Sequence, residues 1–489
     1  MGKMPFRLCL LLFLISLILL KASAAQIFTE DVQFNGSNGD YPYAGLIQGL
    51  DGNFYGTTEF GGKVGGKIIE ADAYSEVLSL YAFSGADGQD PTSPLVQLPD
   101  GSFYGTTAYG GQYSWGTVFR SYERTKLQVL HSFNFTDGGS PNSGLLLGRD
   151  GKLYGTTTSG GNPSCTMNSG CGTVFRMTTD GKLTTLHMFN GTDGANPYLG
   201  SLIQAWDGNF YGTTIAGGTG PECQVDGGCG TIFKLTPKGV FTTLYNFCSQ
   251  PGCADGSEPT AGLTLGPRGY FYGTTLLGAS GYGTIFRMSP DGEVQTMVTF
   301  DGFDGFQPTG GLTLATDGKL YGTAYNGGTN NCYPLNVCGT VYQITPNGGF
   351  KLLHEFDLSD GAAPVGNLLQ ATTGVLYGTT AKGGWLRGQC SLRSGCGTIF
   401  ALDMGIGPFV RALSNFGEVG STVLILGSSL SNATAVSFNS VSAQFKVVSD
   451  TEIKCIVPRG VSNGVISVTV GNQTLKSDLP FIVIPKSKK

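Results

Sequence analysis

Short hydrophobic runs, each bounded by glycine, aspartate or asparagine, fill most of this 489-residue chain. The clearest example contains four consecutive runs, at Gly144–Arg149, Lys152–Thr157, Gly172–Met177 and Lys182–Phe189. Asp150-Gly151 separates the first run from the second, and Asp180-Gly181 separates the third from the fourth. Runs rich in β-branched and aromatic residues with such turns between them are typical of antiparallel hairpins. The pattern therefore predicts a four-stranded antiparallel sheet.

The same unit returns along the chain with a period of about 50 residues. Its second run carries a Tyr-Gly-Thr phrase, centred on Tyr55, Tyr104, Tyr154, Tyr211, Tyr272, Tyr321 and Tyr377. Its third run begins with Gly-Thr or Gly-Lys, at Gly66, Gly116, Gly172, Gly230, Gly283, Gly339 and Gly397. A repeated four-stranded unit of this length is typical of propeller blades. We predict an all-β fold, a seven-bladed β-propeller followed by a smaller domain.

The fourth-strand pattern is displaced relative to the other three. Its first copy, Val32–Phe34, precedes every complete unit, and the last unit stops near Leu402 without one. We therefore expect the N-terminal strand to supply the outer strand of the seventh blade. This arrangement leaves no unpaired sheet edge where the ring meets itself.

Two family resemblances follow from these residues. The units, such as GLLLGRDGKLYGTTTSGG followed by CGTVFRMTTDGKLTTLHMFNGTDG, closely resemble the GloVer repeat of exported bacterial proteins over roughly residues 30–403. That resemblance implies a secreted β-propeller and brings no catalytic residues. The segment PFVRALSNFGEVGSTVLILGSSLSNATAVSFNSV, from Pro408, resembles an IPT/TIG domain, an immunoglobulin-like sandwich. The expected domains are a signal peptide (1–25), the propeller (26–404) and the sandwich (405–489).

Export is also predicted by the first 25 residues. Lys3 and Arg7 precede an apolar run, Leu8–Leu20, and Ala22-Ser23-Ala24 suits signal peptidase. No later run is long enough to span a bilayer. A charged fraction of 13% and a net charge of −5 leave no excess of basic residues of the kind that binds nucleic acid. We expect a secreted, monomeric protein without a membrane span in its mature chain.

Ten of the 12 cysteines fall into five local pairs. The pairs are Cys165 with Cys171, Cys223 with Cys229, Cys248 with Cys253, Cys332 with Cys338, and Cys390 with Cys396. Zinc is the rival interpretation, but no pair has a neighbouring histidine or the usual short ligand spacing. With the export signal, this favours disulfides and no metal. Cys455, in a predicted strand of the C-terminal domain, is expected to be a buried, inert thiol.

Four of the cysteine pairs lie between the second and third strands, and Cys248 with Cys253 lies in the connection to the next unit, so the insertions decorate one face, which is our candidate binding surface. The connections between units reach the same face and carry Asp-Gly-x-x-Pro, beginning at Asp87, Asp137, Asp193, Asp255, Asp304 and Asp360. One interpretation is a ring of carboxylates that binds calcium or a polyhydroxylated ligand. The other is a turn shaped by aspartate, glycine and proline. Recurrence in every unit favours the turn, and we expect no other cofactor.

Residues that break the repeat are stronger candidates for a site. Tyr109, Tyr113 and Trp115 crowd a loop of the second unit, and Trp385 and Arg387 lie in a loop of the seventh. Exposed aromatic rings stack on sugars or anchor protein partners, although they also pack within their own loops. The three histidines, His131, His187 and His354, share one fourth-strand position that holds Tyr or Val in other units, so we interpret them as packing residues.

Two functions remain. The first is a secreted binding or interaction protein that presents a loop-built propeller face to a glycan or protein ligand. The second is an extracellular carbohydrate-active enzyme, a hydrolase or lyase with an acid/base pair at the central channel. The sequence contains no nucleophile elbow, phosphate loop or zinc helix motif. We therefore favour the binding protein and assign no catalytic residue.

Overall fold

The computed structural model describes residues 26–485 except 63–64, 73–75, 166, 168, 224–226 and 331–337. Apart from short 3-10 turns at Pro251–Cys253, Pro267–Gly269, Gly388–Arg393 and Leu430–Asn432, the regular elements of this part of the chain are β-strands. Within it, no helix has the length and apolar character needed to cross a membrane. The predicted signal peptide lies outside the described residues. The fold is all-β, as predicted.

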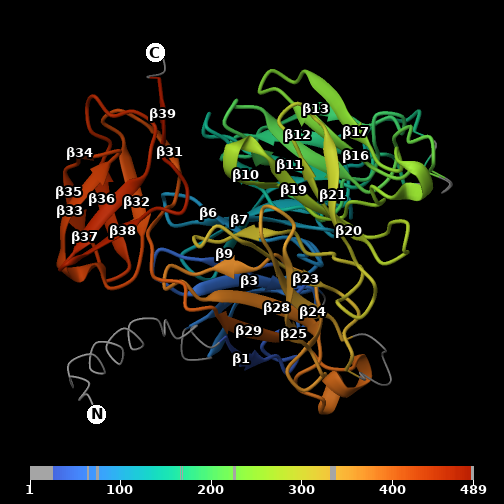
Figure 1. Ribbon diagram of the computed structural model, residues 1–489, viewed down its shortest axis with the longest axis horizontal. Coiled ribbons are helices and arrows are strands. Elements are labelled where there is room, and N and C mark those ends of the chain that lie inside the picture. The colour runs from blue at the N-terminus through green and yellow to red at the C-terminus, as the bar shows by residue number, and fades with distance from the viewer. Residues whose placement is uncertain are drawn as a thin grey trace, which may run out of the picture.

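Repeated four-stranded antiparallel sheets of the kind found in propeller blades form the larger part of the molecule (Figure 1). Sheet 1 contains β2 (Ile47–Gln48), β3 (Phe54–Thr58), β4 (Lys67–Ala71) and β5 (Val77–Ala82). Sheet 2 contains β6 (Val96–Gln97), β7 (Phe103–Thr107), β8 (Thr117–Tyr122) and β9 (Lys126–Ser132). Sheet 3 contains β10 (Leu146–Leu147), β11 (Leu153–Thr157), β12 (Thr173–Met177) and β13 (Leu183–Met188).

The same order continues through the later units. Sheet 4 contains β14 (Ile203–Gln204), β15 (Phe210–Thr214), β16 (Thr231–Leu235) and β17 (Phe241–Asn246). Sheet 5 contains β18 (Thr264–Leu265), β19 (Phe271–Thr275), β20 (Thr284–Met288) and β21 (Val294–Thr299). Sheet 6 contains β22 (Thr313–Leu314), β23 (Leu320–Ala324), β24 (Thr340–Ile344) and β25 (Phe350–Glu355).

Sheet 7 is assembled from both ends of the repeat region. It contains β26 (Ala362–Pro364), β27 (Leu369–Gln370), β28 (Leu376–Lys382), β29 (Thr398–Asp403) and, as its outer strand, β1 (Ile27–Gln33). β1 pairs antiparallel with β29 and places Val32 opposite Ile399. The fourth-strand position of the sequence repeat is thus occupied here by the N-terminal segment.

The innermost strand of each sheet is shorter than predicted. In sheet 3 only Leu146–Leu147 pairs with β11, whereas the sequence predicts a strand over Gly144–Arg149. A Cβ atom at Gly144 would lie 2.7 Å from the Ser201 hydroxyl and 2.8 Å from the Pro94 ring. The chain therefore packs against neighbouring sheets at this point instead of extending its own ladder.

Hydrophobic cores lie between neighbouring sheets. Phe133 of sheet 2 is fully buried, and its ring centroid lies 5.4 Å from that of Phe175 in sheet 3, edge to face. Phe34, just after β1, is equally buried and packs in one cluster with Phe54 and Ile69 of sheet 1. The N-terminal segment therefore belongs to a core between sheets 7 and 1.

Polar bonds also connect successive sheets. The first threonine of the Tyr-Gly-Thr phrase often donates to a carbonyl of the next sheet's entry segment, as in Thr57 to Ser93, Thr106 to Ser143, Thr213 to Ala261, Thr274 to Gly310 and Thr379 to Ala44. Sheets 3 and 4 are bridged by the Gly144 N–H and Ser201 Oγ (3.0 Å), and sheets 6 and 7 by the Thr316 N–H and Gln370 Oε1 (3.0 Å). Sheet 7 thus contacts sheet 1 as well as sheet 6.

The C-terminal part is a β-sandwich around a single core. One sheet has the order β30 (Arg411–Ala412), β32 (Thr422–Leu426), β36 (Glu452–Ile456), β35 (Phe445–Val447), and the other β34 (Val441–Ser442), β33 (Ala433–Phe438), β37 (Ile466–Val470), β38 (Gln473–Lys476). β31 (Phe416–Glu418) and β39 (Ile482–Ile484) form a parallel pair. Ile425 and Ile453 of the first sheet share the core with Phe438 and Ile466 of the second.

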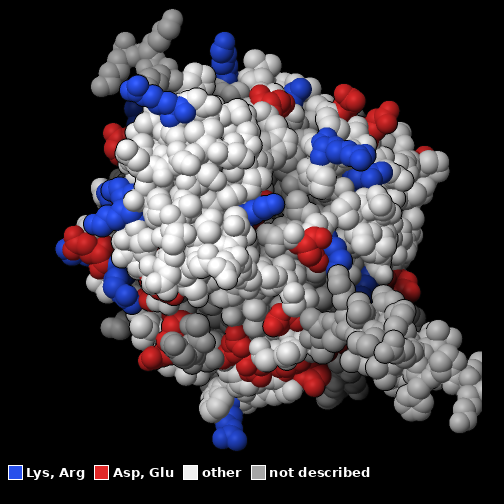
Figure 2. All heavy atoms as spheres, turned by 60° about the vertical axis from the view of Figure 1, so that its left-hand side comes forward, with Lys and Arg blue, Asp and Glu red and all other residues white. Residues whose placement is uncertain are grey.

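The sandwich lies beside the repeat sheets, at the left in Figure 1. The Phe409 N–H donates to the Thr372 carbonyl (3.0 Å), and the Thr451 hydroxyl donates to the Leu50 carbonyl (2.8 Å). Figure 2, which brings this side forward, shows a broad face with few charged side chains and a group of acidic residues along its lower edge.

Candidate functional site

The aspartates of the Asp-Gly-x-x-Pro connections are held inside their own turns. In sheet 2, Asp137 Oδ1 accepts the Asn134 N–H (3.0 Å), and Asp137 Oδ2 lies 2.8 Å from His131 Nε2. The fourth-strand residue contacts the same carboxylate in other sheets, in the pairs His187–Asp193, His354–Asp360, Tyr81–Asp87 and Tyr245–Asp255. Both oxygens thus have local partners, which agrees with the turn interpretation.

Among the described residues, Asp304 is the member of this set without a histidine or tyrosine partner. The corresponding fourth-strand residue of sheet 5 is Val298, which pairs with Ile285. Burial raises the pKa of Asp304 to about 6, and the Asp301 carboxylate adds to the rise while backbone N–H groups oppose it. The turn therefore tolerates the missing partner at an electrostatic cost.

The residue before each of these prolines has a left-handed backbone. The positive φ values are 58° at Tyr41, 54° at Asp90, 50° at Ser140, 52° at Asn196, 58° at Glu258, 55° at Gln307 and 55° at Ala363. Such values are uncommon for residues with a side chain and persist only where the surroundings enforce them. Their side chains differ from unit to unit, so a regular backbone presents an irregular set of groups.

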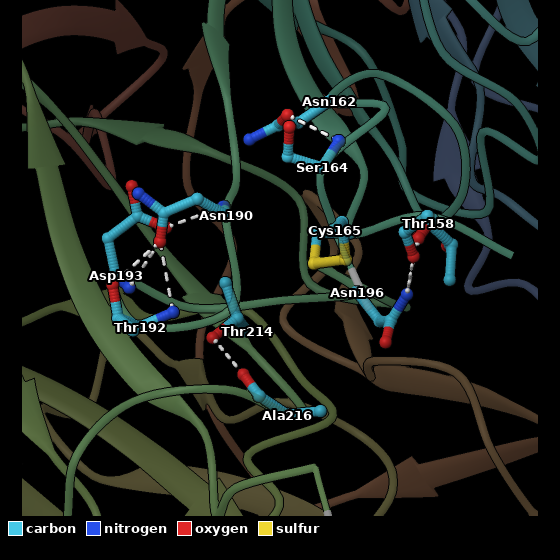
Figure 3. Close-up of a disulfide and its surroundings, with 12 residues drawn as sticks. Thr158, Asn162, Ser164, Cys165, Asn190, Thr192, Asp193, Asn196, Thr214 and Ala216 are labelled. Carbon is cyan, nitrogen blue, oxygen red and sulfur yellow. Dashed lines mark hydrogen bonds between the residues drawn. A yellow bond between two sulfur atoms is a disulfide. The ribbon is translucent and has the colours of Figure 1, made fainter. Parts of the chain in front are cut away.

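The disulfides help to enforce this backbone. Cys165–Cys171, Cys223–Cys229, Cys248–Cys253 and Cys390–Cys396 are bonded, whereas the predicted partner of Cys338, Cys332, lies outside the described residues. The carbonyl of Cys171 accepts the N–H of Asn196 (2.8 Å). Figure 3 shows the Asn196 side chain beside the Cys165–Cys171 disulfide, where its Nδ2 donates to the Thr158 carbonyl (2.7 Å).

The aromatic residues singled out in the sequence lie on two separate loops. Tyr109 and Tyr113 are each 49% exposed between β7 and β8, and the Trp115 ring packs 4.5 Å from that of Phe135. Trp385 is 41% exposed between β28 and β29, with the Arg387 guanidinium 5.6 Å from its ring centre. These loops belong to sheets 2 and 7, and both of these sheets contact sheet 1, which separates them. They do not form one site.

A cluster that the sequence analysis missed lies between sheets 1, 4 and 6. Tyr43, Glu59, Tyr198 and Tyr325, here called the tyrosine cluster, are all half-buried. Tyr43 and Tyr198 lie close enough for each phenol to affect the pKa of the other. Burial raises the pKa of all three tyrosines, and the nearby Glu59 carboxylate raises each further. The Glu59 carboxylate thus lies within electrostatic range of three phenols from three sheets.

Backbone bonds of the turns hold this cluster in place. The Glu59 N–H donates to the carbonyl of Tyr41 (2.9 Å), and the Tyr325 N–H donates to that of Gln307 (3.1 Å). Both acceptors are pre-proline residues with positive φ. A sequence signal for the cluster exists, because Tyr43 and Tyr198 follow prolines where most units have Thr, Asn or Val.

A cavity of about 190 Å³ adjoins Tyr43. Thr92, Leu199, Thr309 and Val365 contribute to its wall, so it is enclosed by the entry segments of several sheets. The hydroxyl oxygen of Thr309 is buried and has no hydrogen-bond partner within the described part of the chain. Buried hydroxyls are normally satisfied, so this one is suited to a water or a ligand. The cavity wall thus offers one aromatic ring and a buried hydroxyl, and the Glu59 carboxylate lies within electrostatic range of that ring.

The fold and the site define a propeller-like repeat protein with an appended sandwich domain. Residues 65–275 and 222–436 match the Gloeobacter/Verrucomicrobia repeat, and residues 408–483 match the IPT/TIG domain. The chain belongs to the Gloeobacter/Verrucomicrobia repeat family. No curated protein matches it.

Several solved structures are similar at low sequence identity. The extracellular domain of a putative hybrid two-component system from Bacteroides thetaiotaomicron has a TM-score of 0.48 and 10% identity, covering 92% of this chain and 57% of that one. A protein of unknown function from the same organism has a TM-score of 0.41 and 14% identity over 77% and 76% of the two chains. A putative gluconolactonase has a TM-score of 0.39 and 12% identity over 79% and 94%. This chain spans little more than half the length of the first.

Proposed function

We propose that this protein is a secreted binding protein whose seven sheets form a closed propeller. Pairing of β1 with β29 and the bond from Thr379 to the Ala44 carbonyl support closure between the last sheet and the first. The disulfides support an oxidising, extracellular location. An extracellular propeller with an IPT/TIG domain suits an interaction role, and the signal peptide over residues 1–25 remains a prediction.

The tyrosine cluster is the proposed ligand site, and the ligand is a saccharide. The observation that carries this proposal is that Tyr43, Tyr198 and Tyr325 all lie within electrostatic range of Glu59, and that Tyr43 borders a cavity. Aromatic rings supply faces for the apolar side of a sugar ring, and a carboxylate accepts hydrogen bonds from sugar hydroxyls. The buried Thr309 hydroxyl offers a further polar contact. Few, well-placed polar groups in a mostly apolar recess are typical of small-ligand sites.

The shape of the site favours the end of a sugar chain over a folded protein surface. The three tyrosines are half-buried rather than projecting, and the adjoining cavity measures about 190 Å³. A recess of this size accepts a thin ligand. Exposed aromatic loops such as Trp385 with Arg387 are the better surface for a protein partner.

The test is binding of the purified protein to a panel of neutral and acidic polysaccharides, followed by Tyr198→Ala and Tyr325→Ala. We expect each substitution to weaken binding about tenfold or more, the loss typical of a central aromatic contact. Trp385→Ala is the matched control, because it also deletes an aromatic ring, but in the loop between β28 and β29 outside the tyrosine cluster. Failure of the panel to bind, or loss of binding only in Trp385→Ala, contradicts the proposed site.

A hydrolase or lyase is the second candidate, favoured by one observation. Asp90 and Glu258 occupy the same pre-proline position in two sheets, and burial raises the pKa of both carboxyls. A raised pKa suits a general acid. Reducing-end release is therefore measured in the same panel, with Asp90→Asn and Glu258→Gln. Release that either variant abolishes supports the enzyme, and retention without release supports the binding protein.

A further inference from the structure

A second and larger cavity lies between the repeat sheets and the sandwich. It measures about 580 Å³, within the range of sites for small organic ligands. Leucines of the short inner strands line one side, including Leu147, Leu265 and Leu314. Phe416 and Leu479 of the sandwich line the other. The cavity is therefore built by two domains and is mainly apolar.

In four sheets the second residue of the short inner strand is a glutamine, and each of these glutamines has a structural role. Its Oε1 accepts a backbone N–H from the turn of the preceding sheet, as Gln97 does from Leu50 (3.0 Å) and Gln204 from Arg149 (2.9 Å). Gln370 accepts from Thr316, and Gln48 accepts from Thr372. Leucine replaces the glutamine in sheets 3, 5 and 6.

The repeat itself explains why two of these residues are leucine instead of glutamine. In the preceding sheet, the residue whose N–H would reach a glutamine at position 147 is Pro99, and for position 314 it is Pro267. Proline has no N–H to donate, so a glutamine would find no partner at either place. Leu265 is different, because the donor position opposite it is Trp206. A glutamine at 265 would have a backbone N–H to bind, yet the chain has leucine. Trp206 itself lines the cavity and is 43% exposed. The repeat architecture does not explain this apolar pair.

The cavity also contains a cation that forms no ion pair within the described part of the chain. Of its two arginines, Arg411 forms an ion pair with Asp478 (2.7 Å). The guanidinium of Arg149 instead donates to the Ala205 carbonyl (2.8 Å), and within the described residues no carboxylate lies in ion-pair contact with it. Burial lowers the pKa of Arg149, and Asp207 only partly offsets this. A bound anion would compensate this loss of water contacts.

We propose that this cavity binds a small carboxylic acid with an apolar body. Arg149 receives the carboxylate through its remaining N–H groups, and the leucines and Trp206 cover the apolar body. The complementary charge at one side and the apolar wall elsewhere select this class over a neutral lipid or a sugar. Since both domains line the cavity, the bound acid also holds the sandwich against the repeat sheets.

The experiment is calorimetric titration of the full chain with octanoate, decanoate and dodecanoate, and with 1-decanol for comparison. We expect the acids to bind, with an affinity that rises with chain length, and decanol to bind more weakly than decanoate. Leu265→Gln introduces the repeat's own residue, so the fold should tolerate it. It should weaken decanoate binding about tenfold, the effect of losing roughly two methylene contacts.

Arg149→Gln separates the charge from the apolar wall. It should weaken decanoate about tenfold and leave decanol unchanged. Tyr198→Ala, on the other site, should leave both unchanged, so this proposal and the saccharide site fail independently. Trp206 emission gives a second readout, because the acid should change it in the wild type and in Trp385→Phe but not in Trp206→Phe. Absence of acid binding, equal binding of decanol, or self-association of the chain through this face would overturn the proposal.

Discussion

The backbone N–H of Tyr41 donates a 3.0 Å hydrogen bond to the carbonyl of Cys396, joining the beginning of the repeat region to its end. Cys396 is bonded to Cys390, and Tyr41 has a left-handed φ of 58°. Asn196 with Cys171 and Glu258 with Cys229 repeat this relationship. A disulfide in one sheet therefore positions the pre-proline residue of the next, and through it the residues around the tyrosine cluster.

Removal of the last disulfide should loosen this region. For Cys390→Ser with Cys396→Ser, we expect the free energy of unfolding to fall by about 2 kcal/mol, because the unfolded chain regains the entropy of a short closed loop. Chemical denaturation of the double variant and of the wild type, each with and without reductant, measures the change. Both cysteines are fully buried, so the difference between the wild type and the double variant under reductant, where neither has this bond, gives the contribution of packing. Equal stability of double variant and wild type under oxidising conditions contradicts the expectation.

Closure of the ring is testable with two equivalent phenylalanines. Phe34 and Phe133 occupy the same repeat position, and both are 0% exposed. If β1 is an integral outer strand, Phe34→Ala should destabilise the protein as much as Phe133→Ala, by about 3–5 kcal/mol. Urea denaturation of both variants gives the comparison. A much smaller loss for Phe34→Ala would mean that the N-terminal strand is peripheral.

The strands were predictable because their signals are local. Each pair of runs with its Asp-Gly turn specifies a hairpin. β11 begins at Leu153 and β12 at Thr173, each one residue after the predicted starts at Lys152 and Gly172. The inner strand of sheet 3 was predicted, but its bounds were too wide, because Gly144 leaves its own sheet to meet Ser201 of another. That contact depends on the arrangement of sheets, which no single run encodes.

The candidate site was harder to predict for the same reason. Tyr43, Tyr198 and Tyr325 lie far apart in sequence, and only the packing of three sheets brings them within electrostatic range of Glu59. The turn role of the aspartates was predictable from their recurrence. Their contact with the fourth-strand histidine was not, because it requires the connection to fold back on the strand, as between His131 and Asp137.

Cys455 should be unreactive in the native protein. Its side chain is 1% exposed, its thiol donates to the Val423 carbonyl (3.4 Å), and burial raises its pKa to about 12. The nucleophilic thiolate is therefore scarce at neutral pH. We expect no labelling by Ellman's reagent in native buffer and one equivalent of reactive thiol per mature chain after denaturation without reductant. Rapid labelling of the folded protein would show that the sandwich opens readily.

Asp304 should make stability depend on pH near neutrality. Its folded pKa of about 6 lies above the ordinary value of about 3.9. Its contribution therefore favours the folded state fully below about pH 4 and is lost as the pH rises through 6. Asp304→Asn removes this titration, so the variant should gain stability relative to the wild type between pH 5 and pH 7. Denaturation at several pH values measures the difference.

Asp137 is the matched control because His131 occupies the position of Val298. Burial alone would raise the pKa of Asp137, but the bonds from His131 and from the Asn134 N–H lower it below the usual value. Asp137 is thus ionised in both states between pH 5 and pH 7, and Asp137→Asn should show no relative gain over that range. Val298→His gives Asp304 the missing partner, so NMR titration of its carboxyl carbon should yield a pKa below that of the wild type. An unchanged pKa would mean that burial of the turn, and not the absent partner, sets the titration of Asp304.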